Sequence, residues 1–93
     1  MVVETVSRFN KDFRVLPSEV QRAVGKVITA LQAADNLESS GLDYKKIQGV
    51  KKTDRYYRIR VGGYRIGLEY IKPDVVLLRV LKRGIAYKYF PPK

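Results

Sequence analysis

Hydrophobic positions in the first third of the chain recur at the spacing of α-helices. They predict two helices, over residues 8–16 and 18–34, after a short strand at residues 2–6. Pro17 ends the first helix, and Ser18 begins a capping-box pattern at the start of the second. The apolar stripe of the second helix consists of Val20, Val24, Val27, Ile28 and Leu31. Both helices therefore need an apolar surface to cover.

Beyond residue 55 the hydrophobic period changes from that of a helix to that of a strand. Residues 56–61 and 64–71 are rich in β-branched and aromatic side chains, and they flank the pair Gly62-Gly63. Two glycines between such runs are typical of a two-residue β-hairpin turn. This turn sets the register of the hairpin, in which Arg60 faces Arg65 across the two strands.

Successive side chains of a strand point to opposite faces of the sheet, so the predicted hairpin has one apolar face and one basic face. The apolar face, which we expect to pack on the helices, carries Tyr57, Ile59, Val61, Tyr64, Ile66, Leu68 and Tyr70. The basic face carries Tyr56, Arg58, Arg60, Arg65, Gly67 and Glu69. Directly opposed like charges destabilise a hairpin, so the pairing of Arg60 with Arg65 favours an anion between their guanidinium groups. Gly67 is expected to leave open space beside Arg58.

The remaining segments complete an α+β architecture within one expected domain, residues 1–93. A third strand is expected over residues 75–81, a short last strand near residues 87–90, and a loop over residues 35–49. The order is β-α-α-β-β-β, followed by the short C-terminal strand. These elements predict two N-terminal helices packed on one face of a mostly antiparallel four-stranded sheet.

The charge of the chain is concentrated in its second half. Residues 1–44 contain five Lys/Arg and six Asp/Glu, whereas residues 45–93 contain fourteen Lys/Arg and three acidic residues. The net charges of the two halves are therefore −1 and +11. This asymmetry indicates an anionic partner, with nucleic acid first, an acidic protein second and an anionic membrane a weaker third.

Composition narrows the chemistry further. The chain has no cysteine and no histidine, and its nine carboxylates form no ligand motif, so we expect neither a metal nor another cofactor. A chain of 93 residues leaves little room for a deep cavity, which favours a large substrate over a small molecule. There is no charged leader and no long apolar run, so we expect a cytoplasmic protein without a membrane partner.

Three stretches of the sequence resemble the RelE/ParE superfamily of type II toxin–antitoxin toxins. They are residues 9–17 (FNKDFRVLP), 57–66 (YRIRVGGYRI) and 82–87 (KRGIAY). The resemblance covers nearly the whole chain and implies the fold of that family. For RelE-type members it implies an endoribonuclease that cuts mRNA in the A site of the 70S ribosome. The RNA 2′-hydroxyl is then the nucleophile, no metal takes part, and a cognate antitoxin is the protein partner.

The resemblance also implies roles for individual residues. The expected catalytic residues are Arg65, Arg83 and Tyr87, and the expected RNA-binding residues are Arg58, Arg60, Lys51, Lys52 and Lys82. Several relatives carry a histidine where this chain has Lys82, so the general base is hard to name. Free Tyr and Lys titrate near ~10, which makes them poor bases at neutral pH. Glu69 is a candidate base, although an ion pair with a neighbouring arginine is the simpler interpretation.

Two alternatives belong to other functional classes. A ParE-type toxin shares the fold but inhibits DNA gyrase and is not a nuclease. An inactive toxin homologue would act only as a binding module for protein or nucleic acid. The combination of Arg65, Arg83 and Tyr87 favours the nuclease.

Overall fold

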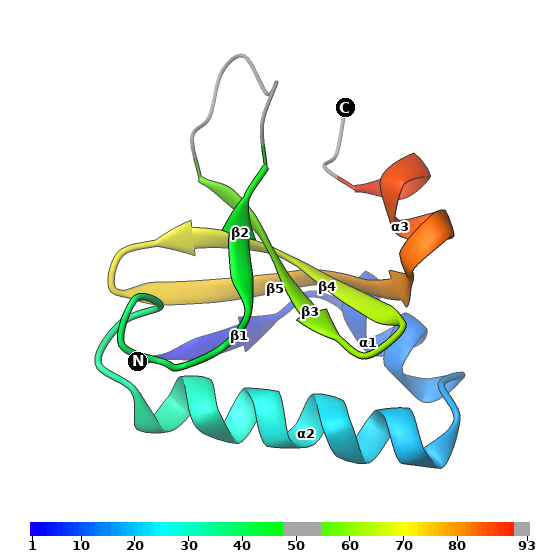
Figure 1. Ribbon diagram of the computed structural model, residues 1–93, viewed down its shortest axis with the longest axis horizontal. Coiled ribbons are helices and arrows are strands. Elements are labelled where there is room, and N and C mark those ends of the chain that lie inside the picture. Colours follow the sequence, from blue (N-terminus) through cyan, green and yellow to red (C-terminus); the bar gives the residue numbers. More distant parts are fainter. Residues whose placement is uncertain (48–54, 91–93) are drawn as a thin grey trace.

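The computed structural model describes residues 1–47 and 55–90, in which strands and helices form a mixed α+β arrangement (Figure 1). The elements are β1 (Val3–Thr5), α1 (Ser7–Arg14), α2 (Ser18–Ala33), β2 (Tyr44–Lys46), β3 (Tyr56–Val61), β4 (Tyr64–Ile71), β5 (Asp74–Lys82) and α3 (Arg83–Tyr89). None of the helices in these two ranges is long and apolar enough to cross a membrane.

The strands form one sheet in the order β1-β5-β4-β3-β2. β1 pairs with β5 in parallel, and the other neighbouring strands are antiparallel. In Figure 1, α2 runs below the sheet and α3 lies above it, so helices cover both faces. The predicted α+β class with two N-terminal helices on a mostly antiparallel sheet is confirmed, but the sheet has five strands instead of four.

Two predictions about individual elements were wrong. The segment expected to be a loop contains β2, which pairs with β3 so that Tyr44 lies opposite Ile59 and Lys46 opposite Tyr57. Three residues are too few to show a strand period in the sequence. The short C-terminal strand expected near residues 87–90 is instead part of α3 and its end. The chain leaves the sheet after Lys82 and packs across β4 and β5 as a helix, with the Phe90 ring over Gly67.

The hairpin of β3 and β4 has the predicted register, in which Arg60 lies opposite Arg65 and Val61 opposite Tyr64. Its apolar face packs into the core, where Ile59, Ile66 and Leu68 are fully buried. The rest of the core comes mainly from the helices and β5: Phe9, Val24, Val27, Leu31, Leu37, Val75, Leu77 and Val80. This burial orients the hairpin, because its opposite face must then point away from α1 and α2.

One tyrosine of the apolar face brings a polar group into the core. The Tyr70 hydroxyl donates a hydrogen bond to Glu38 Oε1 at 2.6 Å and accepts one from the Leu37 backbone N–H at 3.1 Å. Burial, followed by the hydrogen bond to Glu38, raises the pKa of Tyr70. The hydroxyl is thus fully engaged in the fold, as expected for a core tyrosine.

Candidate nucleic-acid interface

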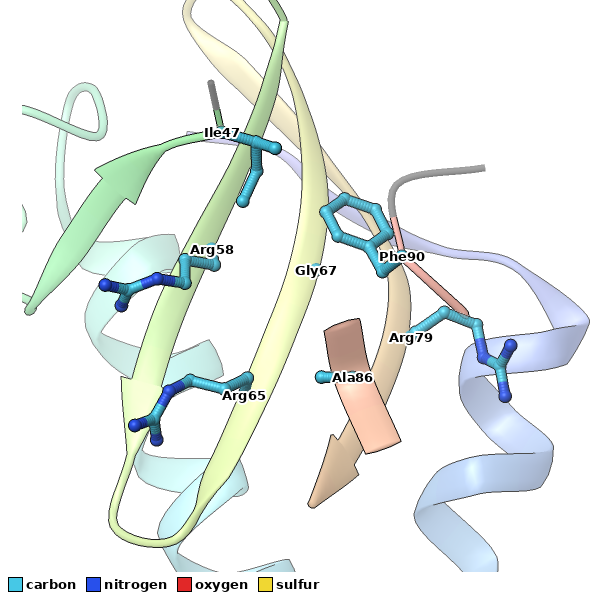
Figure 2. A pocket seen from close by; sticks show the side chains of 7 residues that line it. All are labelled: Ile47, Arg58, Arg65, Gly67, Arg79, Ala86 and Phe90. Atoms are coloured by element: carbon cyan, nitrogen blue, oxygen red, sulfur yellow. The ribbon is translucent and has the colours of Figure 1, made fainter. Parts of the chain in front are cut away.

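The face of the hairpin that points away from α1 and α2 contains a narrow cleft. Its lining comes from β3, β4, β5, the end of β2 and α3: Ile47, Arg58, Arg65, Gly67, Arg79, Ala86 and Phe90. The interior measures about 20 Å³, which is room for roughly one water molecule. Figure 2 shows the side chains of Arg58 and Arg65 leaving neighbouring strands and pointing the same way. We refer to this feature as the Arg58–Arg65 cleft.

Arg65 is buried although it is charged, with 5% of its surface exposed. One of its terminal nitrogens donates hydrogen bonds to the carbonyl oxygens of Gly62 and Tyr64, at 2.9 and 2.8 Å. Its Nε is buried and has no hydrogen-bond partner within residues 1–47 and 55–90. The guanidinium is therefore held in place by the hairpin turn, while its buried Nε–H has no partner in the described residues.

Arg58 lies diagonally across the hairpin from Arg65, opposite Gly67. Its Nη1 is also buried and lacks a partner in the part of the chain that the structure describes. Buried donors in folded proteins are nearly always satisfied, because an unmade hydrogen bond costs about 1–3 kcal/mol. Arg58 and Arg65 thus line the same cleft, and each carries one buried donor without a partner in the described residues. An anion with several acceptor oxygens, such as phosphate, is the kind of ligand that neighbouring guanidinium groups bind on an open face.

Arg60 faces Arg65 in the register, but the two guanidinium groups have different partners. Arg60 Nε lies 3.7 Å from Asp43 Oδ2, and both side chains of this ion pair are more than half exposed. The anion expected between Arg60 and Arg65 therefore stays a prediction. The arginines that the structure brings together in the cleft are Arg58 and Arg65.

Glu69, considered above as a candidate base, forms an ion pair with Arg55 at 3.0 Å. This contact fits the simpler interpretation of its role. In the ranges 1–47 and 55–90, no group of three carboxylates comes together as ligands of a metal ion would. The charged residues that line the cleft are three arginines, Arg58, Arg65 and Arg79, which can donate hydrogen bonds and positive charge.

The open space expected beside Arg58 is filled. The ring of Phe90 lies over Gly67, and three of its carbons are 2.5–2.7 Å from the position that a Cβ at Gly67 would take. The glycine at position 67 indicates the gap in the strand, but not that Phe90 fills it. Phe90 follows the segment predicted as a strand, and nothing local in the sequence indicates that its ring returns to β4.

The two remaining residues of the predicted catalytic set, Arg83 and Tyr87, lie on α3. The helix begins where β5 ends, and the Arg83 N–H donates a hydrogen bond to Gly63 O at 3.0 Å. The side chains of Lys82 and Arg83 are exposed beside the hairpin turn. α3 packs on β4 and β5, so the structure brings this helix to the face that carries Arg58 and Arg65. Lys51 and Lys52, predicted to bind RNA, lie outside the described residues.

Arg79 lines the cleft, but its charge is already compensated. Its Nε and Nη2 donate to the two carboxylate oxygens of Asp12 at 2.7 and 3.1 Å. Asp12 Oδ2 also accepts the Val80 N–H at 3.1 Å. The Arg79 guanidinium carbon lies 5.5 Å from the centroid of the Tyr89 ring. In Figure 2 the guanidinium points away from the cleft toward α1. Arg79 is therefore a structural link between α1, β5 and α3.

Comparisons with known proteins agree with this architecture. Residues 3–87 match the family described as the ParE toxin of the type II toxin–antitoxin system parDE. Toxin RelE3 of Methanocaldococcus jannaschii is 38% identical over 91 residues, which cover 98% of this chain and 100% of that protein.

Solved structures of RelE proteins are similar to this chain. The RelB–RelE antitoxin–toxin complex from Methanococcus jannaschii matches with a TM-score of 0.77 and 36% identity, covering 95% of this chain and 99% of the other. The archaeal RelE–RelB complex from Pyrococcus horikoshii OT3 has a TM-score of 0.66 and 23% identity over 88% and 93% of the two chains, and so shows the fold alone. This chain therefore belongs to the RelE/ParE superfamily of type II toxin–antitoxin toxins.

Proposed function

We propose that this toxin is a RelE-type mRNA interferase, which cuts mRNA in the A site of the 70S ribosome and thereby stops translation. The observation that carries the proposal is that Arg58 and Arg65, which line one cleft, each have a buried donor without a partner in the described residues. The similarity to Toxin RelE3 supports the RelE type. Arg83 and Tyr87, on the helix beside the cleft, complete the proposed site.

The proposed reaction is an internal transfer of the phosphate without a metal. The RNA 2′-oxygen loses its proton and forms a bond to the adjacent phosphorus, while the bond from phosphorus to the 5′-oxygen breaks. That 5′-oxygen takes up a proton as it leaves, and the other product is a 2′,3′-cyclic phosphate. Negative charge builds up on the phosphate oxygens, where Arg58, Arg65 and Arg83 stabilise it. Tyr87 is our candidate for stacking on a base or for moving a proton.

The shape of the cleft supports dependence on the ribosome. An interior of about 20 Å³ cannot enclose a nucleotide, so the RNA would lie across the mouth of this cleft, with few protein walls to fix its conformation. Holding the reacting groups in line accounts for a large part of such a rate acceleration. We therefore assign that task to the ribosome, with Arg60, Lys51, Lys52 and Lys82 of the toxin contacting the RNA backbone. This target implies action in the cytoplasm.

A cognate antitoxin is the second proposed partner. The similar chains from Methanococcus jannaschii and Pyrococcus horikoshii were solved as complexes of RelE with RelB. The net charge of +11 on residues 45–93 would favour an antitoxin with an acidic segment.

The test compares three reactions with the purified toxin. The first contains mRNA on 70S ribosomes, the second the same mRNA without ribosomes, and the third DNA gyrase with supercoiled plasmid as its product. We expect cutting in the first reaction only, with cut sites in the codon at the A site. Inhibition of gyrase without cutting would favour the ParE-type activity, and no effect in any reaction would favour an inactive homologue. Equal cutting of free mRNA would contradict dependence on the ribosome.

Two variants tie the activity to the cleft. Arg58→Ala removes one of the unused donors, and we expect it to reduce cutting on the ribosome. Lys26→Ala is the matched control, because it also removes one positive charge but from an exposed position on α2, across the sheet from the cleft. Cutting that falls equally in both variants would show that net charge, and not the cleft, carries the activity.

A further inference from the structure

The C-terminal helix α3 contacts the β3–β4 hairpin near both of its ends. At its start, the Arg83 N–H donates to Gly63 O at 3.0 Å, next to the hairpin turn. At its end, the Phe90 N–H donates to Ala86 O at 2.9 Å, and the Phe90 ring lies over Gly67. The helix therefore runs along the same face of β4 that Arg65 occupies.

The attachment at the Phe90 end depends on a glycine. A Cβ at Gly67 would lie 2.5 Å from Cγ of Phe90 and 2.6 and 2.7 Å from its two Cδ atoms, so any other residue at this position would displace the ring. The ring also meets Tyr56 edge-on, with centroids 5.6 Å apart. Phe90 is only 7% exposed as a result. We call this arrangement of Gly67, Tyr56 and Phe90 the Phe90 seat.

The helix needs such an anchor. α3 has seven residues, and helices of this length are not stable in water without tertiary contacts. Ala86, which is 8% exposed, is the described residue in the middle of α3 that faces the cleft, and its small side chain adds little contact area. At the end of the helix, Tyr89 lies against Arg79 but is more than half exposed, whereas the Phe90 ring is buried on the sheet. Phe90 is thus a large apolar side chain that holds this end of the helix on β4.

We propose that Phe90, in its seat on Gly67, is a positioning residue for RNA cleavage. By fixing the end of α3, it sets where Arg83 and Tyr87 stand relative to the Arg58–Arg65 cleft. This inference rests on the proposed function. Phe90 itself moves no proton and carries no charge, so its effect on the reaction passes through the residues on α3. Misplacing a reacting group by about 1 Å costs on the order of 10²-fold in rate.

The experiment disrupts the contact between Phe90 and Gly67 by changing each residue in turn. Phe90→Ala deletes the ring, and Gly67→Ala places a methyl group where the ring lies. Phe90→Leu is the conservative variant, because it keeps an apolar side chain over Gly67. Leu31→Val is the control for general loss of packing, since Leu31 is a fully buried core residue of α2. Each variant is assayed for kcat and KM with mRNA on ribosomes. Hydrogen exchange is measured at the amides of residues 83 and 90.

We expect Phe90→Ala and Gly67→Ala to lower kcat on the order of 10²-fold with little change in KM, because Arg58 and Arg60 stay on their strands. Exchange at residue 90 should become faster in both variants. Phe90→Leu should recover most of the lost kcat, and Leu31→Val should keep the wild-type kcat. A merely structural role would reduce the folded fraction without this division between kcat and KM.

Three results would overturn the inference. The first is a folded Phe90→Ala variant with the wild-type kcat although its α3 amides exchange rapidly. The second is a higher kcat in Phe90→Ala, which would mean that the ring obstructs the cleft. The third is an equal loss of kcat in Leu31→Val. A wild-type toxin that leaves translated mRNA intact would overturn the proposed function, and the positioning role with it.

Discussion

Arg60 and Arg65 lie directly opposite each other in β3 and β4, yet their guanidinium groups contact different partners. Arg60 reaches Asp43 at 3.7 Å, whereas Arg65 folds back onto the carbonyl oxygens of Gly62 and Tyr64. The repulsion between opposed like charges is thus relieved within the chain. The two arginines should contribute unequally to the stability of the fold, because the ion pair of Arg60 is exposed and Arg65 is buried.

This difference predicts the stability of two variants. Arg65→Ala removes two hydrogen bonds from a buried charged donor, so we expect the free energy of unfolding to fall by about 1.5–3 kcal/mol. Arg60→Ala removes an exposed ion pair, for which the loss is about 0–1 kcal/mol. Urea unfolding of both variants measures the two losses. Equal losses would contradict the structural role of Arg65.

Arg58→Ala should separate stability from activity. The buried Nη1 of Arg58 has no partner within the two described ranges, so its removal gives up no hydrogen bond from that atom. We expect a free energy of unfolding within about 1 kcal/mol of the wild type. The rate of mRNA cutting on the ribosome should fall on the order of 10²-fold, as for the loss of one donor to a developing charge. A variant that loses stability and activity in parallel would count against a ligand-binding role.

The ion pair of Asp12 with Arg79 should be the costly one to break. Their side chains are only 11% and 15% exposed, and Asp12 also accepts the Val80 N–H. Asp12→Ala leaves a largely buried guanidinium without its carboxylate, which should destabilise the fold by about 3–5 kcal/mol. Asp43→Ala, which removes a carboxylate from an exposed pair, is the matched control. Thermal or urea unfolding that ranks Asp43→Ala as the more harmful change would contradict this prediction.

Acid sensitivity should depend on Glu38. Its hydrogen bond from Tyr70, followed by a backbone hydrogen bond and the contact with Lys72, lowers the pKa of Glu38 below its ordinary value of 4.5. A carboxyl whose pKa is lowered by folding stabilises the protein above that ordinary value. This contribution is lost as the pH falls through the folded pKa.

The prediction follows from comparing the wild type with Glu38→Gln. The difference between their free energies of unfolding should be constant above pH 4.5 and should shrink as the pH falls below it. Urea unfolding at a series of pH values measures this difference. Glu4→Gln, which removes an exposed carboxylate from β1, is the control. A difference that grows on acidification would have the wrong sign.

The parts of the molecule that were predicted correctly are those fixed by local sequence. The Gly62-Gly63 turn determines the register of β3 and β4, and alternation then determines which side chains are buried. β2 and α3 were missed because each is short and depends on contacts distant in the sequence. β2 exists through its pairing with β3, and α3 through its attachment to β4.

Some residues of the candidate site could likewise be predicted from local sequence, and others could not. Arg58 and Arg65 follow from alternation along the hairpin, and the structure brings them into one cleft. Gly67 was identified as a gap in the strand, but the sequence near it does not identify Phe90 as the side chain that fills it. The predicted roles of Arg83 and Tyr87 come from the family resemblance and stay predictions, and both residues belong to α3, which packs on β4 and β5.

The parallel pairing of β1 with β5 has a consequence for biosynthesis. β5 is an interior strand of the sheet, yet it is the last to be made, and the contact of Val2 with Asp74 spans 72 residues. Contacts over such a span form late, because the chain must first close a long loop. β1 therefore stays unpaired until β5 has been made. A product that terminates before residue 74 lacks the strand that joins the N-terminal segment to the hairpin. The cell thus makes no folded toxin domain until β5 has been translated.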